Sequence, residues 1–247
     1  MTISFSNLGI NANPDLANGD DLSAYSNSSW TPPSSGLIRL EVWSRQGDGP
    51  NTPTVSGNGL TWTEIATVAV STVHRLTLFG ADAIGSTTGA TTIDFAGQTQ
   101  IWCKAIFSLA EGVDLSGGVA AAFVQVATNS GVNIDNLSIA LSAAGAADNR
   151  PIAVFMHAWN EDTSPRTNWT ELDDLTGGFN ITGQIQSQYR DDAFETTASA
   201  SWATSISAAG IAAELKAEAA GGGDPEGPMV GGKLVGGGLL IKGRLVG

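Results

Sequence analysis

The sequence predicts an all-β protein: a two-sheet, jelly-roll-like sandwich built from a duplicated strand set, with an extended Gly-rich C-terminal arm. Three observations support this fold class. Charged residues make up only 14% of the 247 residues, and short runs rich in Val, Ile, Thr, Trp and Phe recur along the chain, which favours strands over helices. Turn residues separate these runs at intervals of about ten residues, as in sandwiches. The phrase Trp-Thr-Glu-(Ile/Leu) occurs twice, at 62–65 and 169–172.

The first strand set is expected at roughly 30–110, after a short strand at 3–5 and a turn-rich stretch. In Leu37–Ser44, Ile38, Leu40 and Val42 alternate with Arg39, Glu41 and Trp43. This period of two predicts one buried face. After a long loop, further strands are expected at 60–65, 73–79, 91–95 and 100–109.

The second strand set is expected at roughly 137–216, after a strand-like run at 121–127. Ile152–Trp159 is almost continuously apolar, which is typical of a central strand buried on both faces. Other strands of this set are expected at 137–141, 169–172, 184–190, 199–205 and 211–215.

The two sets agree in order, which indicates an internal duplication. The sequence aligns 37–44 with 152–159, the Trp62 strand with the Trp169 strand, 75–79 with 183–187, and 105–109 with 211–215. Two arrangements remain open: one interleaved sandwich, or two small sandwiches. The absence of a linker between Leu109 and Leu137 favours the interleaved one.

The C-terminal part of the chain changes character. We expect the sandwich to occupy 1–216, a Gly/Ala/Pro-rich linker 217–228, and an assembly arm 229–247. The arm has three basic residues and no acid, so it carries +3, and the rest of the chain carries −16 because the total is −13. Such a peptide becomes ordered by adding to another surface. The arm residues expected to make that contact are Leu234, Val235, Leu239, Leu240, Ile241, Lys242 and Arg244.

Composition argues against several classes of function. An acidic chain with a pI of about 4.3 repels phosphate backbones, so nucleic-acid binding is not expected. A single cysteine, Cys103, allows no internal disulfide and no cysteine-cluster zinc site. The N-terminus does not have the pattern of a signal peptide, and no apolar run is long enough for a membrane-spanning helix. We expect no metal and no cofactor.

Several residues could carry chemistry, but each has a simpler structural interpretation. Glu64 and Glu171 could form the carboxylate pair of a glycosidase, although equivalent positions in a repeat favour a structural role. His74 and His157 lie in strand-like runs and are expected in the core or an interface, and Cys103 in the core. The acidic pairs could bind calcium, but they lack a spaced-ligand pattern and are expected in solvated turns; they are 20–21, 161–162, 173–174 and 191–192.

Three tryptophans form a candidate binding surface for sugars. Trp30, Trp43 and Trp159 could make an aromatic platform, because aromatic faces stack on the apolar faces of sugar rings. The favoured alternative is that they pack in the sandwich core or a subunit interface.

Two motifs give the chain a family resemblance. Pro33-Ser-Ser-Gly-Leu-Ile38 precedes a strand, and Gly59-Leu-Thr-Trp-Thr-Glu-Ile-Ala66 returns in part as Trp169–Leu172. This pattern resembles a β-sandwich family of tailed-bacteriophage structural proteins and some bacterial surface proteins. The segment 230–241 is also similar to C-terminal segments of phage virion proteins.

The resemblance implies a non-enzymatic virion structural protein, made in the host bacterial cytoplasm. Capsid decoration is the favoured role, and a tail or fibre component or a carbohydrate-binding module for host adhesion are the alternatives. The implied partners are the major capsid or tail protein, further copies of the chain in a homo-oligomer such as a trimer, and in the adhesion role a host glycan. A hydrolase acting through Glu64 and Glu171 is the competing class of function.

Overall fold

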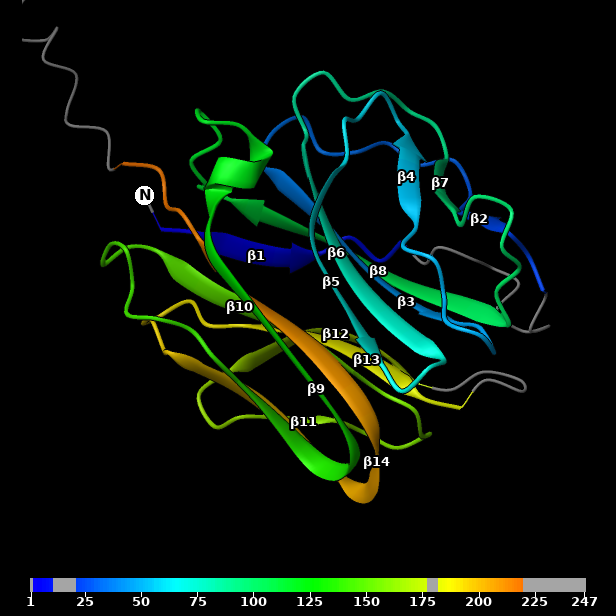
Figure 1. Cartoon of the computed structure of the whole chain (residues 1–247). Helices are drawn as coiled ribbons and strands as arrows, with labels where there is room; N and C mark the ends of the chain where they lie inside the picture. The colour runs from blue at the N-terminus through cyan, green and yellow to red at the C-terminus, as the bar shows by residue number, and fades with distance from the viewer. Residues whose placement is uncertain (1, 11–20, 177–181, 220–247) are drawn as a thin grey trace, which may run out of the picture.

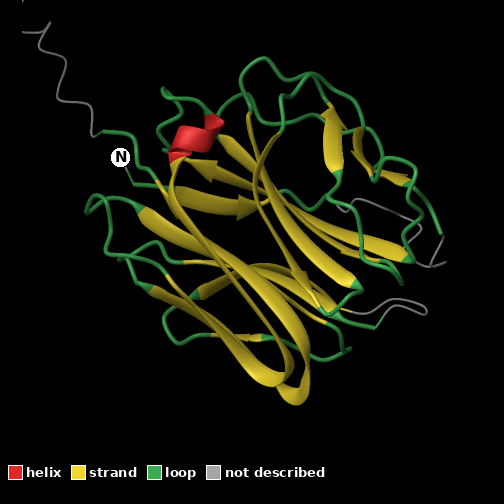
Figure 2. Ribbon diagram, viewed as in Figure 1, coloured by secondary structure: helices red, strands yellow, loops and turns green. Residues whose placement is uncertain are grey.

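The computed structural model describes residues 2–10, 21–176 and 182–219 and shows an all-β chain, as the sequence predicts (Figures 1 and 2). The first half contains β1 (Ser4–Asn7), β2 (Ala24–Ser26), β3 (Leu37–Arg45), β4 (Thr54–Gly57), β5 (Thr63–Val70), β6 (His74–Asp82), β7 (Thr91–Asp94) and β8 (Trp102–Glu111). The second half contains the 3-10 helix η1 (Val119–Ala122), β9 (Phe123–Ala140), β10 (Arg150–His157), β11 (Ser164–Pro165), β12 (Thr170–Thr176), β13 (Gln184–Tyr189) and β14 (Thr197–Leu215).

Each half of the chain builds its own larger sheet. The first has the order β1-β8-β3-β6-β5, and the second has the order β9-β14-β10-β13-β12, with β11 also beside β14. All the neighbouring strands are antiparallel. The strands of the two halves therefore do not interleave, and the favoured arrangement was wrong. The two-sheet sandwich itself is confirmed.

The smaller sheets show that each half is a jelly roll. In the first half, β2-β7-β4 form a separate three-stranded sheet. In the second half, residues 197–201 of β14 pair with 136–140 of β9 on one side and with β11 on the other. If β9 and β14 each count as two strands, both halves have strands 1-8-3-6-5 in one sheet and 2-7-4 in the other. This is jelly-roll order, except that strand 5 stays beside strand 6.

The repeated Trp-Thr-Glu phrase marks the same irregularity in both halves. A β-bulge falls between Glu64 and Ala66 in β5, and another between Glu171 and Asp173 in β12. Starting at each bulge and following the paired residues from strand to strand gives the equivalent positions in the two halves. Leu40 in β3 is equivalent to Ala153 in β10, and Phe107 in β8 is equivalent to Ala212 in β14. The sequence alignment is two residues off at β3 and one residue off at β8.

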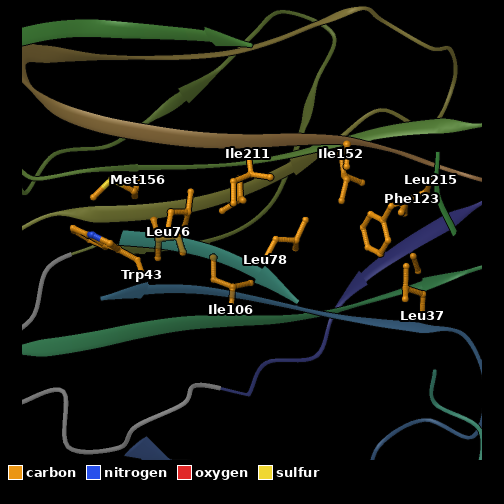
Figure 3. Packing of buried hydrophobic residues seen from close by; sticks show 14 of the residues in the cluster. Leu37, Trp43, Leu76, Leu78, Ile106, Phe123, Ile152, Met156, Ile211 and Leu215 are labelled. Carbon is orange, nitrogen blue, oxygen red and sulfur yellow. The ribbon is translucent and has the colours of Figure 1, made fainter. Parts of the chain in front are cut away.

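The two larger sheets pack face to face and enclose the central core (Figure 3). Strand β5 contacts β9 and β14, and β12 contacts β1 and β8. Equivalent edges therefore meet in a reciprocal way, as in a two-fold symmetric dimer whose subunits are joined in one chain. The central core includes Leu37, Trp43, Leu76, Leu78, Ile106, Phe123, Ile152, Met156, Ile211 and Leu215.

Two outer cores lie within the jelly rolls themselves. In the first, Leu40, Phe79 and Phe107 pack beneath the β2-β7-β4 sheet. In the second, the ribbon of β9 and β14 doubles back over its own sheet, as the lower part of Figure 1 shows, and Ile139 packs against Phe155. Gly210 allows this approach, because a Cβ there would lie 2.7 Å from Phe155 and 2.8 Å from Ile139.

Candidate functional site

The candidate aromatic platform does not form, and Trp43 and Trp30 instead pack in the cores, which is the alternative that the sequence favours. Trp43 is fully buried in the central core, with its ring centroid 4.1 Å from that of Trp102. Trp30 packs edge-on against Phe107, at 5.7 Å, beneath the small sheet of the first half. Trp159 is 47% exposed. The structure therefore leaves Trp159 as the member of this set that presents a large surface to solvent.

The two glutamates of the repeated phrase lie on separate edge strands. Glu64 is in β5 and Glu171 in β12, which are equivalent edges of the two larger sheets. The pseudo-two-fold packing places these edges on opposite sides of the sandwich. Glu171 accepts a hydrogen bond from Gln186 Nε2 at 2.5 Å. A glycosidase-type pair needs carboxylates about 5–9.5 Å apart across one cleft, so these glutamates do not form one.

The histidines and the cysteine are buried. The His74 ring lies beside Trp43 and Trp102, at 5.7 and 5.9 Å, and burial, helped by Arg45, lowers its pKa to about 4. His157 stacks on Trp202 and hydrogen-bonds Thr163. Burial raises the pKa of the Cys103 thiol, which makes it inert. Among the described residues, no three His, Cys, Asp or Glu side chains are grouped to hold a metal ion.

A set of buried charges between the larger sheets was missed by sequence reasoning. Arg39 and Glu41 are both fully buried and form an ion pair at 3.4 Å. Arg39 donates to Ser108 Oγ at 2.7 Å and to Ser187 Oγ at 3.2 Å. Burial lowers the pKa of Arg39 and raises that of Glu41. Charged residues alternate with apolar ones in β3, and such a pattern ordinarily indicates a strand with one solvent face.

Lys104 extends this buried layer toward β12. Its Nζ donates to the carbonyl oxygens of Leu175 and Gly183, at 3.0 and 2.7 Å, and lies 5.6 Å from the centre of the Trp43 ring. Burial lowers the pKa of Lys104 to about 8, although Asp174 opposes the effect. Asp173 and Asp174 were expected in a solvated turn, but they lie in β12 and are partly buried. Arg39, Glu41 and Lys104 are enclosed, so their arrangement is structural.

An open groove lies at one end of the sandwich, and we call it the end groove. It consists of two adjoining pockets of about 530 and 460 Å³, which share Asp114 and Glu218. Five carboxylates line them, with one cation, Lys216, among the lining residues. The carboxylates are Asp82, Glu111, Asp114, Asp148 and Glu218.

The end groove is also where the described chain leaves the body. Asp114 N donates to Lys216 O and Glu218 N donates to Gly112 O, both at 2.9 Å. Ala219, the last described residue, lines the second pocket beside Val124. Lys216 Nζ lies 2.9 Å from Asp114 Oδ2. Hydrogen bonds from Ser116 and Lys216 lower the pKa of Asp114, so it is ionised at neutral pH.

Apolar side chains complete the end groove. Ile84 is 71% exposed and Val124 is 44% exposed, and they line the first and second pocket respectively. The groove therefore offers carboxylates and apolar contacts side by side, which suits a segment that is both basic and apolar.

Comparison of the chain with protein-family models, with curated proteins and with solved structures gives no match. In the described residues there is no helix with the length and hydropathy needed to cross a membrane.

The seven predicted arm residues fall in 229–247, outside the described residues. The assembly arm stays a prediction. The end groove itself is not predictable from the sequence, because its lining comes from six separate segments of the chain. Its clearest local signal is the mixed acidic and apolar run Glu111–Leu115, which begins at the last residue of β8.

Proposed function

We propose that this chain is a non-enzymatic structural protein of a bacteriophage virion, with capsid decoration as its favoured role. The observation that supports this most directly is the joining of two jelly rolls into one body, from one end of which the basic, Gly-rich segment continues. The sequence resemblance to phage structural proteins points the same way. A tail or fibre position is the alternative within this class.

The body suits a particle surface because its sheets are well packed and its charge is acidic. Both larger sheets are buried on two faces, and a fully buried ion pair lies between them. A charge of −16 outside the arm keeps the bodies of neighbouring copies apart in solution. The arm, at +3, has the opposite charge and bears the apolar residues that need a partner surface. Attachment through the arm therefore reconciles solubility with assembly.

Deletion of residues 229–247 tests the attachment. We expect the truncated chain to keep the circular dichroism spectrum of the full chain and to be absent from purified particles, by quantitative mass spectrometry. A full-length variant with Lys233, Lys242 and Arg244 all changed to Gln separates charge from apolar contact, and we expect it to be incorporated less well than wild type. Full occupancy by the truncated chain would exclude the arm as the anchor.

The exposed Trp159 favours carbohydrate binding as a second candidate function. It follows β10 and precedes Glu161 and Asp162, so an aromatic face and polar acceptors lie close in the chain, as sugar recognition requires. If this function holds, a glycan array will show binding that Trp159→Ala abolishes, with Ile84→Ala as an exposed apolar control that leaves it unchanged. An array without any signal above background would remove this candidate.

A further inference from the structure

The end groove and the arm have complementary chemistry. The groove is lined by five carboxylates and one lysine, and the arm has Lys233, Lys242 and Arg244 without an acid. Lys216 already pairs with Asp114, so the groove is acidic beyond what its own lysine neutralises. Charges at such a site attract a cationic peptide, and salt weakens the attraction.

The apolar residues of the two partners also correspond. The arm has Leu239, Leu240 and Ile241 directly before Lys242 and Arg244. The groove places exposed Ile84 and Val124 next to the carboxylates. Covering these side chains is favourable at about 25 cal/mol per Å² of apolar surface removed from water. The glycines between the arm's apolar residues permit close approach of its backbone.

The length of the chain makes the contact possible within one molecule. The described chain ends at Ala219 inside the groove, and residues 220–228 follow before the arm begins. Nine residues span at most about 30 Å. Because the segment starts inside the groove, this reach is long enough for the arm to fold back onto the groove. A short tether also gives an effective concentration in the mM range, so a weak site is occupied by its own arm first.

We propose that the end groove binds the arm of the same chain, through the segment 239–244, while the protein is free in solution. The arm is then held on the body and becomes available when a particle surface competes for it. The second statement rests on the proposed function, whereas the first concerns the isolated protein alone.

Disulfide trapping in the full-length chain tests the docking. The natural Cys103 is buried and stays silent, so Ile84→Cys combined with Leu240→Cys provides the two reactive thiols. The matched control combines Leu240→Cys with Val132→Cys. Val132 is 55% exposed and lies eight residues along β9 from Val124, which corresponds to about 25 Å.

In dilute protein at low salt, we expect mild oxidation to join positions 84 and 240 within one chain. Its yield should be at least about fivefold that of the control pair, measured by mass spectrometry of tryptic peptides. Changing Lys233, Lys242 and Arg244 to Gln, or adding about 0.5 M salt, should reduce the yield several-fold. Circular dichroism confirms that each variant is folded.

Three results would overturn the proposal: equal yields at 84 and 132, no disulfide at 84 in the folded variant, or disulfides that join separate chains. The last would assign the groove to the arm of a second copy. The outcome is independent of particle incorporation. If arm deletion prevents incorporation but no disulfide forms at position 84, the proposed function is retained and only the docking is excluded. If the disulfide forms but the truncated chain is still incorporated, the docking is retained and attachment through the arm is excluded.

Discussion

At the scale of single residues, burial decides which ionisable groups affect stability. His74 is only 5% exposed, and its Nδ1 has no hydrogen-bond partner among the described residues. The rings of Trp43 and Trp102 beside it supply no hydrogen-bond acceptor for a proton on that nitrogen. Desolvation first, and repulsion from Arg45 second, lower its pKa from 6.5 to about 4. The folded protein therefore holds His74 neutral where the unfolded chain is protonated.

This difference predicts a stability loss in mild acid. Between pH 6.5 and 4 the unfolded chain binds a proton at position 74 that the folded chain does not, so the free energy of unfolding falls as the pH falls. The contribution of His74 is at most about 3 kcal/mol across this window. We expect His74→Phe, which keeps an aromatic ring between the tryptophans, to lose less stability than wild type between pH 7 and 4.5, in urea titrations.

The comparison between the two proteins isolates His74 from the other groups. Glu41 has a raised pKa and acts in the opposite direction, and His157 acts in the same direction, but both are present in wild type and variant. Parallel stability curves for the two proteins over this pH range would show that His74 is protonated in the folded state.

At the scale of strands, the two repeats place different types of residue at equivalent buried positions. The paired ladders make Arg39, Glu41 and Ser108 equivalent to Ile152, Val154 and Ala213. All six face the central region between the larger sheets. One repeat uses a buried ion pair with a hydroxyl partner where the other uses apolar side chains. A buried ion pair is often no more stabilising than well-packed apolar residues, but loss of one partner is costly.

The apolar residues of the second repeat therefore indicate which substitutions can replace the buried ion pair of the first repeat. We expect Arg39→Ile alone, or Glu41→Val alone, to lower the free energy of unfolding by about 3–5 kcal/mol, because each leaves a buried charge without its partner. The triple variant Arg39→Ile, Glu41→Val and Ser108→Ala copies the second repeat and should lie within about 1 kcal/mol of wild type, in denaturant titrations. A triple variant as unstable as the sum of the singles would show that the ion pair itself stabilises the core.

Strand patterns explain what the sequence could and could not predict. Alternation located β3, β6 and β8, and the repeated Trp-Thr-Glu phrase aligned the halves because it marks a bulge in both. The strands β9 and β14 were each predicted as two, since the apolar period breaks where the ribbon bends and its register shifts between Ser201 and Ala208. Alternation also predicts only one buried face, so a second layer over the other face of β3 could not be foreseen.

The candidate site was predictable only in its chain-local part. The basic and apolar character of 229–247 is a continuous stretch of sequence. The end groove joins residues from positions 35 to 219, and only the tertiary fold brings them together. Trp43 remains a candidate for a binding surface as long as its strand is expected to have one solvated face, and the packing of the second larger sheet buries it in the central core.

At the scale of the whole molecule, the three cores share walls. The larger sheet of the first half contributes Leu76 and Ile106 to the central core and Leu40 and Phe107 to its outer core. The larger sheet of the second half is likewise the wall of the central core and of the second outer core. Neither larger sheet can lose its partner without exposing a face that is apolar. The two jelly rolls are thus expected to depend on each other for stability.

This arrangement predicts one cooperative unfolding transition rather than two. Phe107→Ala, in the first outer core, should cost about 3–5 kcal/mol, and so should Phe155→Ala in the second. Each substitution should shift the unfolding transition of the whole molecule. Far-ultraviolet circular dichroism reports all strands, and tryptophan fluorescence includes Trp43 and Trp102 in the central core. The two measurements should therefore give the same midpoint. Calorimetry should show a single peak in wild type and in both variants. A shared central core couples the two halves, because loss of either larger sheet exposes the inner face of the other. A variant in which one half unfolds at low temperature while the other keeps the wild-type midpoint would therefore show that the jelly rolls are independent.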